Sequence, residues 1–218
     1  MKTIKKTLPL MTENKLMEAA LKHLRRDPIL NDLIDKVGEL PLLNQDLNIH
    51  NALQKSIVSQ QLSTKVADTI FQRYLVLNGG ELIPEQVVNL DVADMRNVGL
   101  SFQKAGYLKN VSQFFIENPE LNTGLSEMSD EELVKKLTSI KGVGEWTVQM
   151  LLIFVLNRHD VLPLDDLIVR KGIIFHYGLD ETDKKVKSKC TEIAENWRPY
   201  RSFASRYMWA SKDMILEK

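Results

Sequence analysis

The sequence of 218 residues predicts an all-α protein, and three observations lead to this prediction. Apolar residues recur at intervals of three and four along almost the whole chain, and no segment alternates convincingly as a strand would. Helix-start signals precede apolar runs, as in the capping box of Ser129 and Glu132. Gly and Pro residues follow many of these runs, which is where helices end. The pattern indicates about ten helices and no sheet.

Helices are expected throughout the N-terminal half of the chain. Asp27-Pro28 ends the first of them, Ser63 is a plausible N-cap for the third, and Gly79-Gly80 ends that third helix. In order, the expected helices cover 12–26, 49–61, the segment from 63 to 79, short stretches after Pro84 and Asp91, and 101–117.

The C-terminal half continues the helical pattern with one sharp break. A helix opens at Ser129 and carries Leu133 and Leu137, and the pattern breaks at Gly142-Val143-Gly144. The remaining expected helices cover 145–156, 165–178, 182–196 and 199–216.

The overall charge and the cysteine content restrict the function. Lys plus Arg equals Asp plus Glu at 29 each, so a nucleic-acid partner would have to be bound by a local patch or by backbone amides. The single cysteine, Cys190, can form no internal disulfide and cannot hold an iron–sulfur cluster. No run of about 18 apolar residues occurs, and the basic start at 1–6 lacks the apolar region of a signal peptide. We therefore expect an intracellular protein that does not span a membrane.

The segment 133–156 is predicted to be two helices joined by the Gly-x-Gly turn. Two glycines permit positive φ and a close backbone approach, and the second helix begins with N–H groups that face outward. Such amides bind a DNA phosphate without any net charge on the protein. The alternative is an ordinary turn between two helices.

Two adjacent carboxylates, Asp165 and Asp166, follow Pro163-Leu164. A purely structural explanation is a helix start, with Asp165 as the N-cap and Asp166 in the first turn. The alternative is that one of them is catalytic.

The resemblance to a known family rests on several segments in the same order. The turn 140–144 resembles the helix-hairpin-helix DNA-binding motif, and Glu145-Trp146-Thr147 with the downstream Pro163-Leu164-Asp165-Asp166 resembles the catalytic region of the helix-hairpin-helix DNA glycosylases. The most similar family is that of 3-methyladenine DNA glycosylase II. The matching segments, within 25–211, also include 57–63, 99–104, 196–204 and Met208-Trp209.

The resemblance implies two helical lobes that flank a cleft. One lobe would contain 49–158, and the other would contain 1–48 and 159–218. It also implies a monomer that excises alkylated bases, such as 3-methyladenine and 7-methylguanine, from damaged double-stranded DNA in base excision repair. Its place would be the bacterial cytoplasm and nucleoid, or the nucleus in a eukaryote.

The same resemblance assigns roles to individual residues. Asp166 would be the catalytic carboxylate, and Gln61, with Gln60 beside it, would be the wedge that fills the space left by a flipped base. The residues expected to line the base pocket are Trp146, Met150, Leu167 and Trp209. Those expected to bind a DNA phosphate are Gly142, Val143, Gly144 and Thr147. A monovalent cation, Na⁺ or K⁺, would be held by the backbone carbonyls of Thr138, Ile140 and Val143.

Members of this superfamily that nick the strand use a lysine two residues after the second hairpin glycine. Trp146 occupies that position here. We therefore expect a monofunctional glycosylase without AP lyase activity, for which no cofactor is required.

Three other functions are compatible with parts of this pattern. A non-catalytic DNA-binding protein of the same fold would lack the carboxylate or the pocket. A glycosylase for oxidised or deaminated bases is disfavoured by the missing lysine and the missing cluster cysteines. A helical protein–protein scaffold would show no salt-sensitive DNA binding.

Overall fold

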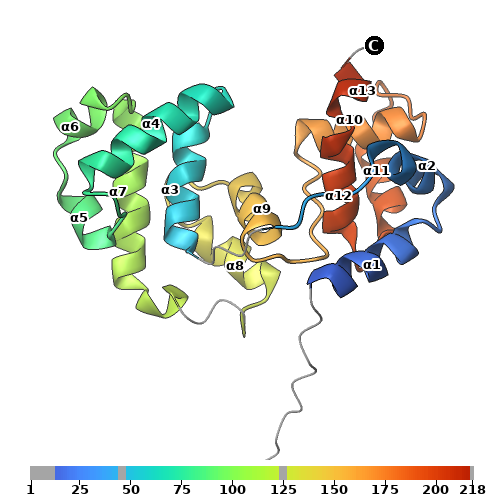
Figure 1. Cartoon of the computed structure of the whole chain (residues 1–218), viewed down its shortest axis with the longest axis horizontal. Coiled ribbons are helices and arrows are strands. Elements are labelled where there is room, and N and C mark those ends of the chain that lie inside the picture. The colour runs from blue at the N-terminus through green and yellow to red at the C-terminus, as the bar shows by residue number, and fades with distance from the viewer. Residues whose placement is uncertain (1–12, 44–47, 123–126, 217–218) are drawn as a thin grey trace, which may run out of the picture. The chain divides into compact units, whose positions relative to one another are not determined.

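The computed structural model describes residues 13–43, 48–122 and 127–216, and it contains helices and no strands within these ranges, so the all-α prediction is confirmed (Figure 1). Its helices are α1 Glu13–Leu24, α2 Pro28–Val37, α3 Ile49–Ser59, α4 Thr64–Leu77, α5 Pro84–Asn89, α6 Val92–Asn97, α7 Phe102–Glu117, the 3₁₀-helix η1 Pro119–Asn122, α8 Asp130–Leu137, α9 Glu145–Phe154, α10 Leu167–His176, α11 Val186–Glu195, α12 Arg201–Ala210 and α13 Lys212–Leu216. None of the helices described has the length and apolar character needed to cross a membrane.

The chain divides into two compact units. The terminal unit consists of residues 1–43 and 159–218, and the central unit consists of residues 44–158. The division from sequence placed the first boundary at residue 49 instead of 44 and the second boundary at the same place.

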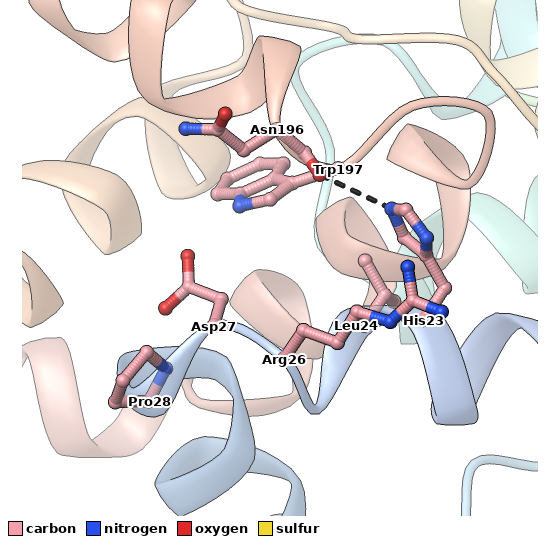
Figure 2. A pocket seen from close by; sticks show the side chains of 7 residues that line it. All are labelled: His23, Leu24, Arg26, Asp27, Pro28, Asn196 and Trp197. Atoms are coloured by element: carbon pink, nitrogen blue, oxygen red, sulfur yellow. Dashed lines mark hydrogen bonds between the residues drawn. The ribbon is translucent and has the colours of Figure 1, made fainter.

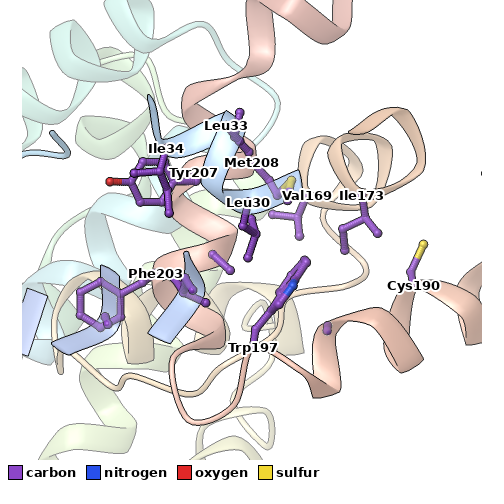
Figure 3. Close-up of a cluster of buried hydrophobic side chains, with 14 of the residues drawn as sticks. Leu30, Leu33, Ile34, Val169, Ile173, Cys190, Trp197, Phe203, Tyr207 and Met208 are labelled. Atoms are coloured by element: carbon purple, nitrogen blue, oxygen red, sulfur yellow. The ribbon is translucent and has the colours of Figure 1, made fainter. Parts of the chain in front are cut away.

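The terminal unit is built around α12. This helix is buried at every position from Ser202 to Met208 and packs against α1, α2, α10 and α13. Figure 3 shows the apolar side chains that meet around it. The labelled members of this cluster are Leu30, Leu33, Ile34, Val169, Ile173, Cys190, Trp197, Phe203, Tyr207 and Met208.

The central unit is built around α7, which packs against α3, α5 and α6. A buried polar group joins α3 to α7: the Nε2 atoms of His50 and Gln54 each lie 2.8 Å from the Ser112 hydroxyl. Tyr74 of α4 donates to Oε1 of Gln54 over 3.1 Å. These bonds satisfy groups that would otherwise be costly to bury. Burial lowers the pKa of His50.

The sequence prediction missed α2 and expected one helix where the structure has two. The pair Asp27-Pro28, expected to end the first helix, also begins α2. Asp27 caps α2 by accepting the N–H groups of Ile29 and Leu30, and Pro28 is the first residue of α2. The helix expected over 199–216 is two helices, α12 and α13. The capping box of Ser129 and Glu132 is present as predicted. Thr12 and the basic start at 1–6 lie outside the described residues.

Candidate active site

The carboxylate of Asp166 is the N-cap of α10. Its Oδ1 atom accepts the backbone N–H groups of Ile168 at 2.9 Å and Val169 at 3.0 Å. The expectation that Asp165 caps this helix is therefore wrong by one residue. The chain turns at Asp166 with φ of −66° and ψ of 128°, the extended conformation of an N-cap, and this aims the Asp166 side chain at the free amides.

A third donor reaches the same carboxylate oxygen. Trp209, on α12, donates its indole N–H to Oδ1 of Asp166 over 2.9 Å. Because two backbone amides and one rigid side chain converge on one atom, the orientation of the carboxylate is fixed. Trp209 is partly buried, and its contact with the catalytic candidate was not predicted.

The close packing of α10 on α12 brings Trp209 to Asp166. A Cβ atom on Gly172 would lie 3.0 Å from Cβ and Sδ of Met208, the residue before Trp209. That spacing is tighter than a normal carbon contact, so glycine is what allows the two helices to approach at this level.

The segment leading into Asp166 is held by the start of α12. Ser202 donates its backbone N–H to the carbonyl of His159 over 2.9 Å and accepts the N–H of Val161 on its hydroxyl over 2.9 Å. Arg201 forms an ion pair with Asp160 at 2.7 Å with only 14% of its side chain exposed. These contacts tie the chain before Asp166 to the helix that carries Trp209.

Asp165 lies in a different environment from its neighbour. It is exposed, and Lys187 forms an ion pair with it at 2.6 Å, which lowers the pKa of Asp165. Leu167, expected in the base pocket, follows directly and is 54% exposed. The two aspartates thus have different surroundings: Asp166 accepts three N–H groups, whereas Asp165 forms an exposed ion pair. From the sequence, only the family resemblance separated them.

The predicted hairpin connects α8 to α9, and its two glycines serve different purposes. Gly142 has φ of +106°, whereas Gly144 has φ of −95° and is the N-cap of α9. Of these two glycines, only Gly142 adopts the positive φ that glycine permits. A Cβ at Gly142 would lie 2.3 Å from Cγ of Tyr107, so the turn rests directly on that ring. At Gly144 nothing lies within 4 Å of such an atom.

The wedge candidates form a tight turn after α3. Gln60 has φ of −52° and ψ of 128°, Gln61 has φ of +60°, and Leu62 donates its N–H to the Ser59 carbonyl over 3.2 Å. These values are those of a type II turn, whose third residue is usually glycine or asparagine. Gln61 is exposed. Gln60 donates its side-chain amide to the Gly142 carbonyl over 3.4 Å, so the turn also contacts the hairpin.

Three further candidates lie on α9. Trp146 is 43% exposed, whereas Thr147 is only 4% exposed. Thr147 and Met150 line a groove of about 240 Å³ between α3 and α9. Thr147, of which a phosphate contact was expected, therefore exposes little of its surface.

A monovalent cation was expected on the backbone carbonyls of Thr138, Ile140 and Val143. The carbonyl of Ile140 accepts the N–H of Val143 at 3.0 Å, and a carbonyl keeps a second lone pair for another partner. The turn is thus compatible with such an ion. Within the described residues, no cluster of three or more His, Cys, Asp or Glu side chains is arranged to hold a metal.

The chain matches the HhH-GPD superfamily of base excision DNA repair proteins over residues 54–198. It belongs to this superfamily. The match includes the turn at Gln60 and Gln61, the hairpin and Asp166.

Two proteins similar to this chain carry related names. DNA-3-methyladenine glycosylase 1 of Schizosaccharomyces pombe is 37% identical over 169 residues, which is 76% of this chain and 73% of that protein. The putative DNA-3-methyladenine glycosylase YfjP of Bacillus subtilis is 33% identical over 189 residues, 84% of this chain and 65% of that protein. This chain therefore spans just under two thirds of the length of YfjP.

Solved HhH-GPD structures resemble this fold closely. The Schizosaccharomyces pombe enzyme in complex with abasic DNA superposes with a TM-score of 0.76 at 34% identity, over 89% of this chain and 97% of that one. The DNA-3-methyladenine glycosidase of Bacillus halodurans gives a TM-score of 0.79 at 32% identity, over 91% of each chain.

A separate pocket of about 400 Å³ lies in the terminal unit, where α1 and α2 meet the end of α11 (Figure 2). Asp27 points into it, but Oδ1 of Asp27 caps α2 and Oδ2 accepts the hydroxyl of Tyr177 at 2.6 Å. Trp197 in turn donates to the Tyr177 oxygen over 3.2 Å. These polar groups serve the packing of the unit, and none of the predicted site residues lines this pocket.

Proposed function

We propose that this HhH-GPD protein is a monofunctional DNA glycosylase that excises alkylated bases from double-stranded DNA in base excision repair. The observation that carries the proposal is the convergence of three N–H donors, including the Trp209 indole, on one oxygen of Asp166. The names of its relatives, which are DNA-3-methyladenine glycosylases, support the substrate class.

The reaction breaks the bond between the sugar and the base. The base leaves with the bonding electron pair, and positive charge develops on the sugar, as it does in glycoside hydrolysis. The Asp166 carboxylate stabilises that charge or accepts a proton from the attacking water, whose oxygen bonds to the anomeric carbon. A base alkylated on a ring nitrogen already carries a positive charge and leaves neutral, so no second group is needed to protonate it. The products are a free base and an abasic site.

The base must leave the duplex before this chemistry can occur. The exposed Gln61 would fill the vacated space, and its amide can hydrogen-bond the base left without a partner. Backbone N–H groups at Gly142 and Gly144 would bind a phosphate at the start of α9, where the helix dipole favours an anion. The N–H of Val143, for which the same role was expected, donates to the Ile140 carbonyl within the turn. This mode of binding needs no excess of basic residues, in agreement with the zero net charge.

We infer that Trp146, Met150 and Leu167 contact the flipped base. Trp146 and Leu167 expose 43% and 54% of their surfaces, which leaves apolar area for a base to cover. An alkylated base is a cation, and a tryptophan ring attracts a cation over its face. For Trp209, the hydrogen bond to Asp166 supports orientation of the carboxylate in addition to any stacking.

We further propose that the enzyme leaves the DNA strand intact and acts as a monomer. Trp146 supplies no amine at the position of the lyase lysine, so no Schiff base with the sugar can form there. A monovalent cation on the carbonyls of Thr138, Ile140 and Val143 would add a positive charge beside the phosphate. The protein would work where DNA is, in the nucleoid or the nucleus.

The proposal is tested by incubating methylated duplex DNA with the protein and identifying released bases by mass spectrometry. We expect free 3-methyladenine and 7-methylguanine, with abasic sites that break only on later alkali treatment. Borohydride is added to a second sample to trap any Schiff base. DNA binding without release would favour the non-catalytic alternative, and a borohydride-trapped adduct would contradict monofunctional chemistry.

A further inference from the structure

The conformation of the Gln61 turn is unusual for its sequence. In a type II turn the third residue takes a left-handed conformation that favours glycine, and here that residue is glutamine with φ of +60°. A type I turn would give this residue φ near −90° and avoid the disfavoured conformation. Other contacts must therefore hold the type II form.

Lys104, in the first turn of α7, makes the contacts that can do this. Its Nζ donates to the carbonyl oxygens of Val58 and Gln60, each at 2.7 Å. The Gln60 carbonyl belongs to the central peptide of the turn. Type I and type II turns differ by a rotation of that peptide, which would carry this oxygen away from Nζ. The bond from Lys104 thus selects the type II turn, and with it the position of Gln61.

The same side of α7 also supports the hairpin. Tyr107 lies under Gly142, as the 2.3 Å spacing to a Cβ there indicates, and Asn110 donates its side-chain amide to the Lys141 carbonyl over 3.3 Å. Lys104, Tyr107 and Asn110 are three residues apart, which places them along one side of the helix. Together with the bond from Gln60 to Gly142, these contacts link the two turns that would touch DNA.

The partial burial of the Lys104 ammonium group also indicates that this lysine holds the turn. Burial lowers the pKa of Lys104, because its ammonium group loses part of its hydration. A lysine on the surface of a helix would avoid this cost by extending into water. At this position its donors are used on two backbone carbonyls of a single turn.

We propose that Lys104 is a positioning residue that holds Gln61 in the conformation needed to enter the duplex. It acts through the Gln60 carbonyl and does not touch the reacting atoms. This inference rests on the proposed function, in which Gln61 fills the space of the flipped base.

The chain offers a matched control on the same helix. Lys109 also donates to two backbone carbonyls, those of Val88 at 3.0 Å and Leu90 at 2.5 Å, at the C-terminal end of α5. Lys109→Met removes an equivalent pair of bonds from a helix end with no proposed contact to DNA. Lys104→Arg retains a charged donor that can reach a carbonyl, so it serves as the conservative variant.

The experiment measures insertion and base release separately in the whole chain of 218 residues. Insertion is followed by the fluorescence of 2-aminopurine placed next to a tetrahydrofuran abasic analogue, which needs no chemistry. Release is followed by single-turnover rates on a duplex containing 7-methylguanine. We expect Lys104→Met to lower both the fluorescence increase and the release rate by ~10-fold, since the left-handed Gln61 is no longer held. We expect affinity for undamaged duplex to change less than twofold, Lys104→Arg to recover much of the loss, and Lys109→Met to match the wild type.

The outcomes separate this inference from the proposed function. Equal losses in Lys104→Met and Lys109→Met, or no loss in either, would overturn the role of Lys104. If Lys104→Met lost affinity for undamaged duplex to the same extent as it lost fluorescence, the role would also be overturned. The defect would then lie in DNA binding and not in the insertion of Gln61. If the wild type gives the fluorescence change and releases no base, the proposed function fails, while the role of Lys104 is still supported by the loss in Lys104→Met.

Discussion

The two units hold their functional groups in opposite ways. In the terminal unit, donors from the backbone and from Trp209 converge on a side-chain oxygen of Asp166. In the central unit, Lys104 and Asn110 of α7 donate to backbone oxygens of the Gln60-Gln61 turn and the hairpin, respectively. The first arrangement fixes a side chain, and the second fixes the path of the chain. The proposed function would require this, because catalysis depends on the position of one charge and phosphate binding depends on the direction of backbone amides.

The largest expected effect comes from the reacting group itself. We predict that Asp166→Asn lowers the single-turnover rate of base release by about three orders of magnitude, because the charge opposite the developing cation is lost. The fold should be retained, since asparagine caps a helix as well as aspartate does. Thermal unfolding and DNA affinity measured beside the rate would show this.

Asp165→Asn is the matched control for that prediction. It removes only an exposed ion pair with Lys187, in which the two side chains are 66% and 61% exposed, and such pairs contribute little to stability. The release rate should stay within about twofold of the wild type. An inactive Asp165→Asn beside an active Asp166→Asn would reverse the assignment of the two carboxylates.

The two hairpin glycines allow the central unit to be tested in the same paired way. Gly142→Ala should lower the free energy of unfolding by about 3 kcal/mol, because it combines a left-handed φ with an overlap on the Tyr107 ring. Gly144→Ala should lower the free energy of unfolding by less than about 1 kcal/mol, since nothing lies within 4 Å of the added Cβ and only the helix cap is altered. Urea unfolding of both variants measures the difference, and equal stabilities would mean that the turn does not rest on Tyr107.

A smaller loss than that of the carboxylate itself is expected from changing how the carboxylate is oriented. Trp209→Phe keeps an aromatic ring and removes the N–H group that donates to Asp166. Loss of one hydrogen bond to a charged group should slow release by about tenfold, while the two backbone donors remain. The readout is the single-turnover rate with substrate saturating, so that weaker binding does not contribute. A rate equal to the wild type would mean that Trp209 acts by packing alone.

Sequence reasoning reached the helices and the candidate carboxylate through different signals. Local signals predicted the capping box at Ser129 and the helix ends at Gly79-Gly80, because such motifs act within a few residues. They predicted that the first helix ends before Asp27-Pro28 but missed that α2 begins there, because Pro follows one helix and is equally suited to begin the next. They also placed the cap of α10 one residue early, since two adjacent aspartates give the same signal.

Contacts over long sequence separation were not predictable from a single sequence. Trp209 is 43 residues from Asp166. The family resemblance assigned both to one site, but no local pattern indicates the hydrogen bond between them. Lys104 lies in a segment that resembled the family, yet its partners are carbonyls 44 and 46 residues earlier. Backbone acceptors have no sequence signature, so this role becomes visible only in three dimensions.

The measurement that tests the account most directly is a pair of single-turnover rates, for 3-methyladenine and for hypoxanthine, in otherwise identical duplexes. Each rate is divided by the rate of spontaneous loss of that base. The site assigns one carboxylate and no general acid, so a base that must be protonated to leave should be released more slowly. We predict faster release of 3-methyladenine, with both rates lost in Asp166→Asn. Faster release of hypoxanthine than of 3-methyladenine, with Asp166 intact, would contradict a single-carboxylate mechanism for cationic bases.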